Sequence, residues 1–196
     1  MKKFLLMSAM SAVMIFSSCG GSSKSNEDAK DSNHTEEVKD SKVLVAYYSA
    51  TGTTAKAAGE LANATGGTLY EITPETPYTD EDLDYENEKS RSAVENKNPD
   101  MRPAIKTGLD ISPYETVYVG FPVWWDKAPL VVYTFLDSYD FSGKKIVVFA
   151  TAHSSGLTPS FEALKAAYPK YDFTEGKILN NTSGDSFNEW VKSLSK

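Results

Sequence analysis

The segment at residues 42–56, KVLVAYYSATGTTAK, constrains the fold more than any other part of the sequence. Its first half, Val43 to Tyr48, is an almost unbroken apolar run, which is typical of a parallel strand covered on both faces. A hydroxyl-rich turn follows, and a helix is expected from about Thr54, so that free N–H groups and the positive end of the helix dipole favour an anion. The alternative is an ordinary helix N-cap without a ligand. The segment predicts a phosphate site made by Ser49, Ala50, Thr51, Gly52, Thr53 and Thr54.

Short β-branched runs alternate with amphipathic segments along residues 42–196, which predicts parallel strands joined by crossover helices. Five strands are expected, at residues 43–48, 68–72, 116–121 and 144–150 and in a weaker pair of segments at 171–173 and 177–180. Helical spacing predicts a final helix whose buried face includes Phe187, Trp190, Val191 and Leu194. The pattern indicates an α/β fold with a doubly wound five-stranded parallel sheet, in the order 2-1-3-4-5, with helices on both faces. Ligands of such sheets bind where the strand order reverses.

The turn after the third strand carries two adjacent tryptophans at the carboxyl end of the strand. An indole offers a large face on which a flat ligand can stack, and consecutive side chains point in different directions. One tryptophan can therefore stack on a ligand while the other packs or rims the pocket; the alternative is that both are core residues. The candidate contacts in this turn are Pro122, Val123, Trp124, Trp125 and Asp126.

The turn after the fourth strand is made of small residues, whose backbone amides can approach a ligand closely. Its histidine, His153, is either a proton donor close to a ligand, suited by its near-neutral titration, or a turn residue hydrogen-bonded to backbone. The candidate contacts in this turn are Thr151, Ala152, His153, Ser154, Ser155 and Gly156.

Together the three turns resemble the flavodoxin-like family, whose members carry S-x-T-G-x-T, P-x-W-W and T-S-G-G-S-G-type turns. The resemblance covers roughly residues 42–196, and the matching positions are Thr51, Gly52, Thr54, Pro122, Trp124, Trp125, Thr151, Ser155 and Gly156. It implies non-covalently bound FMN, with its phosphate in the first turn, and transfer of one or two electrons. Two positions depart from the family pattern: Ala50 stands where arginine is frequent, and Ala152-His153 replaces a small Ser-Gly pair.

The N-terminus has the features of an export signal. Met1-Lys2-Lys3 precedes an apolar run from Phe4 to Phe16, which is too short for a comfortable membrane span. Residues 17–20, SSCG, resemble a bacterial lipobox, so we expect a lipoprotein signal peptide at 1–18, lipidation of Cys19, a disordered tether at 19–41 and the FMN-binding domain at 42–196. These expectations place the protein in the bacterial cell envelope. The alternative is a cleaved signal with an incidental cysteine.

Charge and motif content narrow the choice of partners. A formal net charge of −7 argues against nucleic acid. Neither G-x-x-x-x-G-K-[ST] nor G-x-G-x-x-G occurs, which argues against the usual sites for nucleoside triphosphates and dinucleotides. No cluster of histidines and cysteines predicts a metal site, and Cys19, the only cysteine, cannot form an intrachain disulfide. We expect a monomer.

The leading functional prediction is an FMN electron carrier at the envelope, working with a redox partner protein or a small quinone-like acceptor. An FMN-dependent NAD(P)H:quinone-type reductase is one alternative, because quinone reductases of similar fold can bind the nicotinamide over the flavin. A cofactor-free binding or structural lipoprotein is another, and Ala50 and His153 keep it open. The acidic chain, with Asp126 beside the tryptophans, should lower the potential of the last flavin reduction step.

Overall fold

The computed structural model describes residues 41–194. They form one five-stranded sheet with the strand order β2-β1-β3-β4-β5, in which all neighbouring strands are parallel. The strands are β1 Val43–Tyr47, β2 Thr68–Glu71, β3 Thr116–Pro122, β4 Lys145–Thr151 and β5 Asp172–Ile178. The predicted fold class and strand order are confirmed. The expected signal peptide, Cys19 and the tether up to residue 40 lie outside the described residues.

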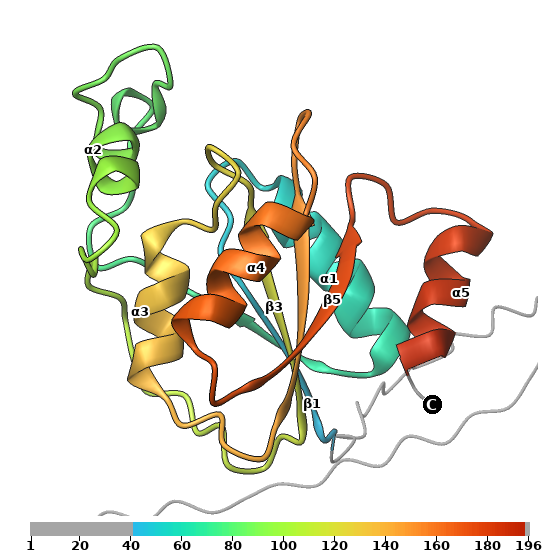
Figure 1. The fold of residues 1–196 in the computed structure, drawn as a ribbon. Coiled ribbons are helices and arrows are strands. Elements are labelled where there is room, and N and C mark those ends of the chain that lie inside the picture. Colours follow the sequence, from blue (N-terminus) through green and yellow to red (C-terminus); the bar gives the residue numbers. More distant parts are fainter. Residues whose placement is uncertain (1–40, 195–196) are drawn as a thin grey trace, which may run out of the picture. The chain divides into compact units, whose positions relative to one another are not determined.

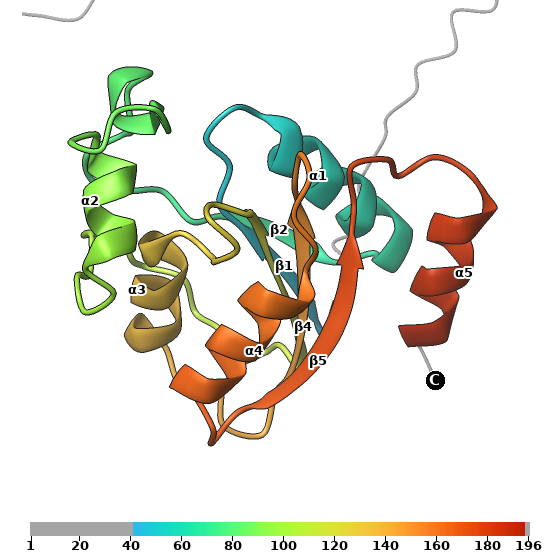
Figure 2. The same cartoon turned by 45° about the horizontal axis from the view of Figure 1, so that its top comes forward.

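Helices cover both faces of the sheet (Figure 1). One layer holds α1 Thr53–Thr65 and α5 Asp185–Leu194, and the opposite layer holds α3 Leu130–Ser138 and α4 Thr158–Ala167. Figure 2 shows the strands running between the two layers. Each layer buries its own hydrophobic cluster against the sheet. The polypeptide is therefore doubly wound, with the order of connection reversing between β1 and β3.

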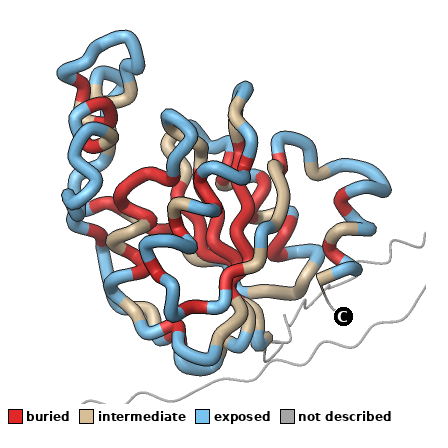
Figure 3. Tube along the Cα trace, in the orientation of Figure 1, coloured by how far each residue is buried: buried red, intermediate tan, exposed pale blue. Residues whose placement is uncertain are grey.

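The central strands are buried on both faces because their side chains pack alternately against the two helix layers. In β1, Leu44 and Ala46 belong to the cluster under α3 and α4, whereas Val45 and Tyr47 belong to the cluster under α1 and α5. Figure 3 shows this buried material concentrated in the middle of the sheet. An apolar run without polar alternation is the sequence signature of a strand covered on both faces.

The last strand and helix differ from the sequence prediction. Two weak segments were expected, but the structure has a single strand, β5, whose register against β4 shifts between Val148 and Ala150. A Cβ atom at Gly176 would lie 2.2 Å from the Val148 carbonyl oxygen, so glycine allows this close approach. In α5, Phe187 is buried but Trp190 is only partly buried, because α5 lies beside α1 at the margin of its layer (Figure 1).

An excursion of the chain at residues 73–108, which we call the β2–β3 excursion, contains a short 3-10 helix, Glu81–Leu83, and α2 Arg91–Lys97. An antiparallel bridge between Pro74 and Ile105 closes its base. Its interior is held by Glu95, which accepts hydrogen bonds from the Tyr78 hydroxyl at 2.6 Å and from Arg91 Nε at 2.8 Å. In Figure 1, α2 stands away from the sheet, beyond α3.

Candidate functional site

A cavity of about 660 Å³ brings the three predicted turns together at the carboxyl ends of β1, β3 and β4. We call it the main cavity. Nine of the predicted site residues line it: Ala50, Thr51, Pro122, Val123, Trp124, Trp125, His153, Ser154 and Ser155. The excursion adds Leu83, Tyr85 and Ser92.

The first turn leaves its hydroxyls and the helix N-terminus open. Gly52 has a left-handed backbone, with φ of 87°, and its N–H donates to Ser49 Oγ at 3.1 Å. No side chain caps α1, and its first turn carries no acidic residue. The hydroxyls of Thr51 and Thr53 lie 3.5 Å apart on exposed residues. This turn can therefore offer hydroxyls and backbone N–H groups to an anion.

Thr54 and Thr151 have a different position from the other predicted contacts. Their hydroxyl oxygens lie 2.7 Å apart, and the residues are 1% and 4% exposed. Neither side chain lines the main cavity. The contact joins the start of α1 to the end of β4, so it fixes the spacing between the first and third turns.

The two tryptophans have different environments: one packs against tyrosines and the other is partly exposed. Trp124 packs edge-on against Tyr48, with ring centroids 5.7 Å apart, and against Tyr78 at 5.4 Å. Trp125 is 40% exposed and presents its indole to the cavity region. Burial raises the pKa values of both Tyr48 and Tyr78. The negative charge of Glu95 raises the pKa of Tyr48 further. The hydrogen bond that Tyr78 donates to Glu95, and then the charge of Glu95, raise the pKa of Tyr78 further. Both phenols therefore stay neutral well above the pH at which an exposed tyrosine ionises.

Trp125 sits in a strained two-residue turn. Trp124 and Lys127 exchange two backbone hydrogen bonds of 2.9 Å, and the residues between them, Trp125 and Asp126, have φ of 47° and 61°. A left-handed conformation costs a residue other than glycine about 1–3 kcal/mol. Ser160 of α4, which is fully buried, donates to the Asp126 carbonyl oxygen at 3.0 Å and holds the turn in place.

The third turn is positioned by a residue that sequence reasoning missed. Asn180, just after β5, accepts a hydrogen bond from the Ala152 N–H at 2.9 Å and donates to the Ala152 carbonyl at 2.5 Å. The Val123 N–H also donates to the Thr151 carbonyl at 2.9 Å, which ties the second turn to the third. His153 is exposed and lines the main cavity, and within residues 41–194 its ring makes no hydrogen bond.

Several predicted contacts are close to the main cavity in sequence but do not line it: Ser49, Gly52, Thr53, Asp126, Ala152 and Gly156. Conversely, Leu83, Tyr85 and Ser92 reach it from the β2–β3 excursion. Of these three residues, only Leu83 and Tyr85 have a signal in the sequence: they are apolar side chains within a strongly acidic stretch.

Residues 41–194 contain no group of three or more histidine, cysteine, aspartate and glutamate side chains placed to hold a metal ion. Among the helices of that part, none has the length and apolar character needed to span a bilayer.

The comparisons with known proteins agree with this architecture. The family model described as Flavodoxin matches residues 42–194. A candidate flavoprotein from Bacteroides eggerthii is 45% identical, with a TM-score of 0.76 over 79% of this chain and 98% of that chain. A second, from Bacteroides uniformis, is 44% identical, with a TM-score of 0.74 over 76% and 97%.

A more distant structure, a flavoprotein in complex with FMN from Lactobacillus acidophilus, is 18% identical, with a TM-score of 0.63 over 79% of this chain and 98% of that chain. At that identity the likeness shows the fold alone. No curated protein matches the sequence. The family match spans most of the chain, and the sheet order agrees with it, so the chain belongs to the flavodoxin family.

Proposed function

We propose that the chain binds FMN non-covalently in the main cavity and serves in electron transfer. The observation that carries this proposal is the convergence of a hydroxyl-rich turn, an exposed indole and a small-residue turn around one space of about 660 Å³. That volume falls within the range of roughly 300–1,000 Å³ that is usual for cofactor sites. The Lactobacillus acidophilus structure of the same fold, which contains FMN, and the family match support the choice of cofactor.

The residues present fit the parts of FMN. Thr51 lines the cavity, and together with the neighbouring Thr53 hydroxyl and the open amides at the start of α1 it suits a monophosphate, since the phosphate charge meets the positive end of the helix dipole. Trp125 suits the flat ring system, and Leu83 and Tyr85 line the same cavity. His153 lines the same cavity. When bound, FMN supplies transfer of one or two electrons, and the protein tunes its potential.

FMN binding is tested by titrating the full chain with FMN and following flavin fluorescence. We expect quenching to saturate at one FMN per chain and the purified complex to be yellow. A chain that stays colourless and leaves the fluorescence unchanged contradicts the proposal and favours the cofactor-free alternative.

The phosphate contact has its own test, because riboflavin lacks the phosphate. In Thr51→Val the affinity for FMN should fall about tenfold or more, since a hydrogen bond to a charged group contributes about 1.5–3 kcal/mol, whereas the affinity for riboflavin should hold. Thr107→Val, at an exposed position outside the main cavity, is the matched control. An equal loss for both flavins would contradict the phosphate assignment.

The acidic stretch at residues 80–88 favours a carrier that meets a basic redox protein. Its carboxylates flank Leu83 and Tyr85, which line the main cavity, so a positively charged partner would be drawn toward that rim. A small quinone-like acceptor is the other partner considered. Steady-state NAD(P)H oxidation with a quinone acceptor separates the roles: turnover without a second protein supports a reductase, and its absence supports a carrier.

Envelope location through a lipid on Cys19 remains part of the proposal, and it rests on the sequence of residues 1–20. In cells, the wild-type chain should fractionate with membranes, and Cys19→Ser should release it. An unchanged distribution of Cys19→Ser would remove the anchor from the proposal.

A further inference from the structure

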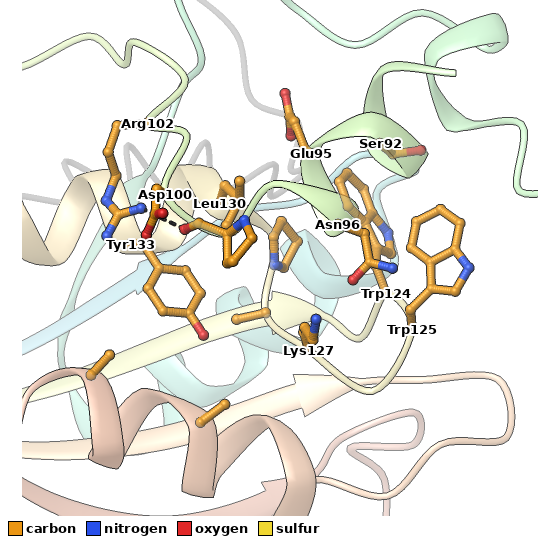
Figure 4. Close-up of a pocket in the computed structure, with 15 residues that line it drawn as sticks. Ser92, Glu95, Asn96, Asp100, Arg102, Trp124, Trp125, Lys127, Leu130 and Tyr133 are labelled. Atoms are coloured by element: carbon orange, nitrogen blue, oxygen red, sulfur yellow. Dashed lines mark hydrogen bonds between the residues drawn. The ribbon is translucent and has the colours of Figure 1, made fainter. Parts of the chain in front are cut away.

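A second cavity, of about 310 Å³, adjoins the main cavity, and Figure 4 shows the side chains that line this second cavity. It shares Ser92, Trp124 and Trp125 with the main cavity and is otherwise built from α2, the segment that follows α2, the turn at 127–129, α3 and α4. None of the three turns predicted from the sequence accounts for it, apart from the two shared tryptophans. We call it the side cavity.

Two polar atoms in its wall lack partners. Ser92 Oγ and Asn96 Oδ1 are both buried, and neither has a hydrogen-bond partner among the described residues. Ser92 is 3% exposed. The two residues are four positions apart in α2, so they lie on the same side of the helix. A buried polar group without a partner costs about 1–3 kcal/mol, and such groups in native proteins usually have a water or a ligand as a partner.

The remaining wall defines the shape and polarity of an occupant. The rings of Trp124, Trp125 and Tyr133 and the side chain of Leu130 make most of it apolar and aromatic. The phenol of Tyr133 is neutral at physiological pH, since its ordinary pKa is 10.0 and burial raises that pKa further. Four charged residues also line it: Glu95, Asp100, Arg102 and Lys127. Arg102 is already paired with Asp137 at 2.5 Å and Glu95 with Arg91 at 2.8 Å, and the remaining two, Asp100 and Lys127, have opposite charges. A flat, mostly apolar molecule fits this wall better than an anion.

Asn96 Oδ1 can only accept a hydrogen bond, whereas the Ser92 hydroxyl can donate or accept. We propose that the side cavity binds a flat aromatic molecule that carries a hydroxyl group, of the phenol or quinol class. Its hydroxyl donates to Asn96 Oδ1 and accepts from Ser92 Oγ after a rotation of these short side chains. Figure 4 shows the Asn96 amide directed from α2 toward the turn that carries Lys127. The binding step needs no cofactor and does not rest on the proposed FMN site.

A matched pair of probes tests the proposal: 2-naphthol, which has the hydroxyl, and 2-methoxynaphthalene, which cannot donate. Both are titrated calorimetrically into the full chain, with and without FMN. We expect 2-naphthol to bind about tenfold more tightly than its methyl ether, and FMN to leave its affinity within about threefold. Stoichiometric displacement of 2-naphthol by FMN, or equal affinity for the two probes, would overturn the proposal.

Two variants locate the site. Ala163→Phe fills the side cavity from α4 without touching the main cavity and should abolish binding of both probes, whereas Ala166→Phe, at an exposed position on the same helix, should not. Asn96→Leu removes the acceptor at nearly constant volume and should bring the affinities for the two probes together. Retained 2-naphthol binding in Ala163→Phe would place the probe elsewhere and contradict the assignment. FMN affinity, measured in the same variants, should stay unchanged, so a failure of the FMN proposal remains a separate result.

Discussion

Trp125 and Asp126 occupy left-handed backbone positions that a tight two-residue turn normally gives to asparagine and glycine. Their conformation is maintained by contacts elsewhere, of which the hydrogen bond from Ser160 is the one supplied by a buried side chain. Strain of this kind concentrates at ligand sites, and here it lies beside the main cavity. A residue that maintains this backbone, such as Ser160, therefore affects the shape of the main cavity without contacting a ligand itself.

Replacing Ser160 should show this effect. In Ser160→Ala the Asp126 carbonyl loses its buried donor, so the free energy of unfolding should fall by about 1–3 kcal/mol in urea titrations. Ser193→Ala, which removes an exposed hydroxyl from α5, should change it by less than about 0.5 kcal/mol. Equal stabilities of Ser160→Ala and wild type would mean that the turn holds its conformation without this bond.

The buried hydroxyl pair of Thr54 and Thr151 gives a second prediction at this scale. Either single change to valine leaves one buried oxygen unpaired and should cost about 1–3 kcal/mol of stability. The double variant removes both oxygens and should recover most of that loss, which urea titrations of the four proteins measure as a coupling energy. Additive losses would show that the two hydroxyls act independently. A much larger loss of FMN affinity in Thr54→Val than in Thr151→Val would instead give Thr54 a direct contact with the phosphate.

Among the elements, β3 and β4 meet closely at Gly120, whose register partner is Phe149. A Cβ atom at residue 120 would lie 2.1 Å from the Phe149 ring. Gly120→Ala should therefore lower the free energy of unfolding by about 1–3 kcal/mol or more, the range for overpacked cores. In a Phe149→Leu background the same change should cost clearly less. Thermal or urea unfolding of both pairs provides the comparison, and an equal cost in the two backgrounds would exclude the ring as the cause.

The elements also show which parts of the structure can be predicted from the sequence. Strands β1, β3 and β4 were predicted within one residue at each end, because continuous apolar runs bounded by turn residues leave few other structures open. β5 was predicted as two pieces, since a register shift at Gly176 and its polar residues interrupt the pattern. Local signals do not report such long-range contacts.

The residues of the site likewise fall into those that can be predicted from the sequence and those that cannot. The three turns that meet at the main cavity follow from the strand order, so nine of their residues could be placed there from the sequence. Asn180 and Ser92 could not, because a side chain that fixes a distant turn, or one that reaches the cavity from an excursion, has no motif of its own. Thr54 and Thr151 match the family motifs, yet the structure pairs them with each other in the interior.

For the molecule as a whole, buried tyrosines should govern stability in alkaline solution. Burial, followed by the interaction with Tyr139, raises the pKa of Tyr70 to about 12 from its ordinary value of 10.0. Burial likewise raises the pKa values of Tyr48, Tyr78 and Tyr168. Above pH 10 the unfolded chain loses these protons while the folded chain keeps them. The stabilisation is therefore complete below pH 10 and is lost as the pH rises toward 12 and beyond.

Unfolding titrations from pH 8 to pH 12 measure this loss. The free energy of unfolding of Tyr70→Phe should decline less steeply above pH 10 than that of the wild type. The difference between the two proteins at pH 8 reports the other contacts of the Tyr70 hydroxyl, including its hydrogen bond to the Lys106 carbonyl. If the two proteins decline in parallel from pH 10 to pH 12, Tyr70 titrates at the same pH in the folded and unfolded chains.

The strained turn at Trp125 and Asp126 has a consequence for binding kinetics and affinity. Since the turn is closed by backbone hydrogen bonds and by Ser160, the backbone that carries the exposed indole is already fixed when a flat molecule arrives. The backbone of this wall therefore needs no ordering on association, so that part of the entropic penalty is met during folding rather than at binding. Affinity at this rim would then depend on the rigidity of the scaffold as much as on the surface that the ligand covers.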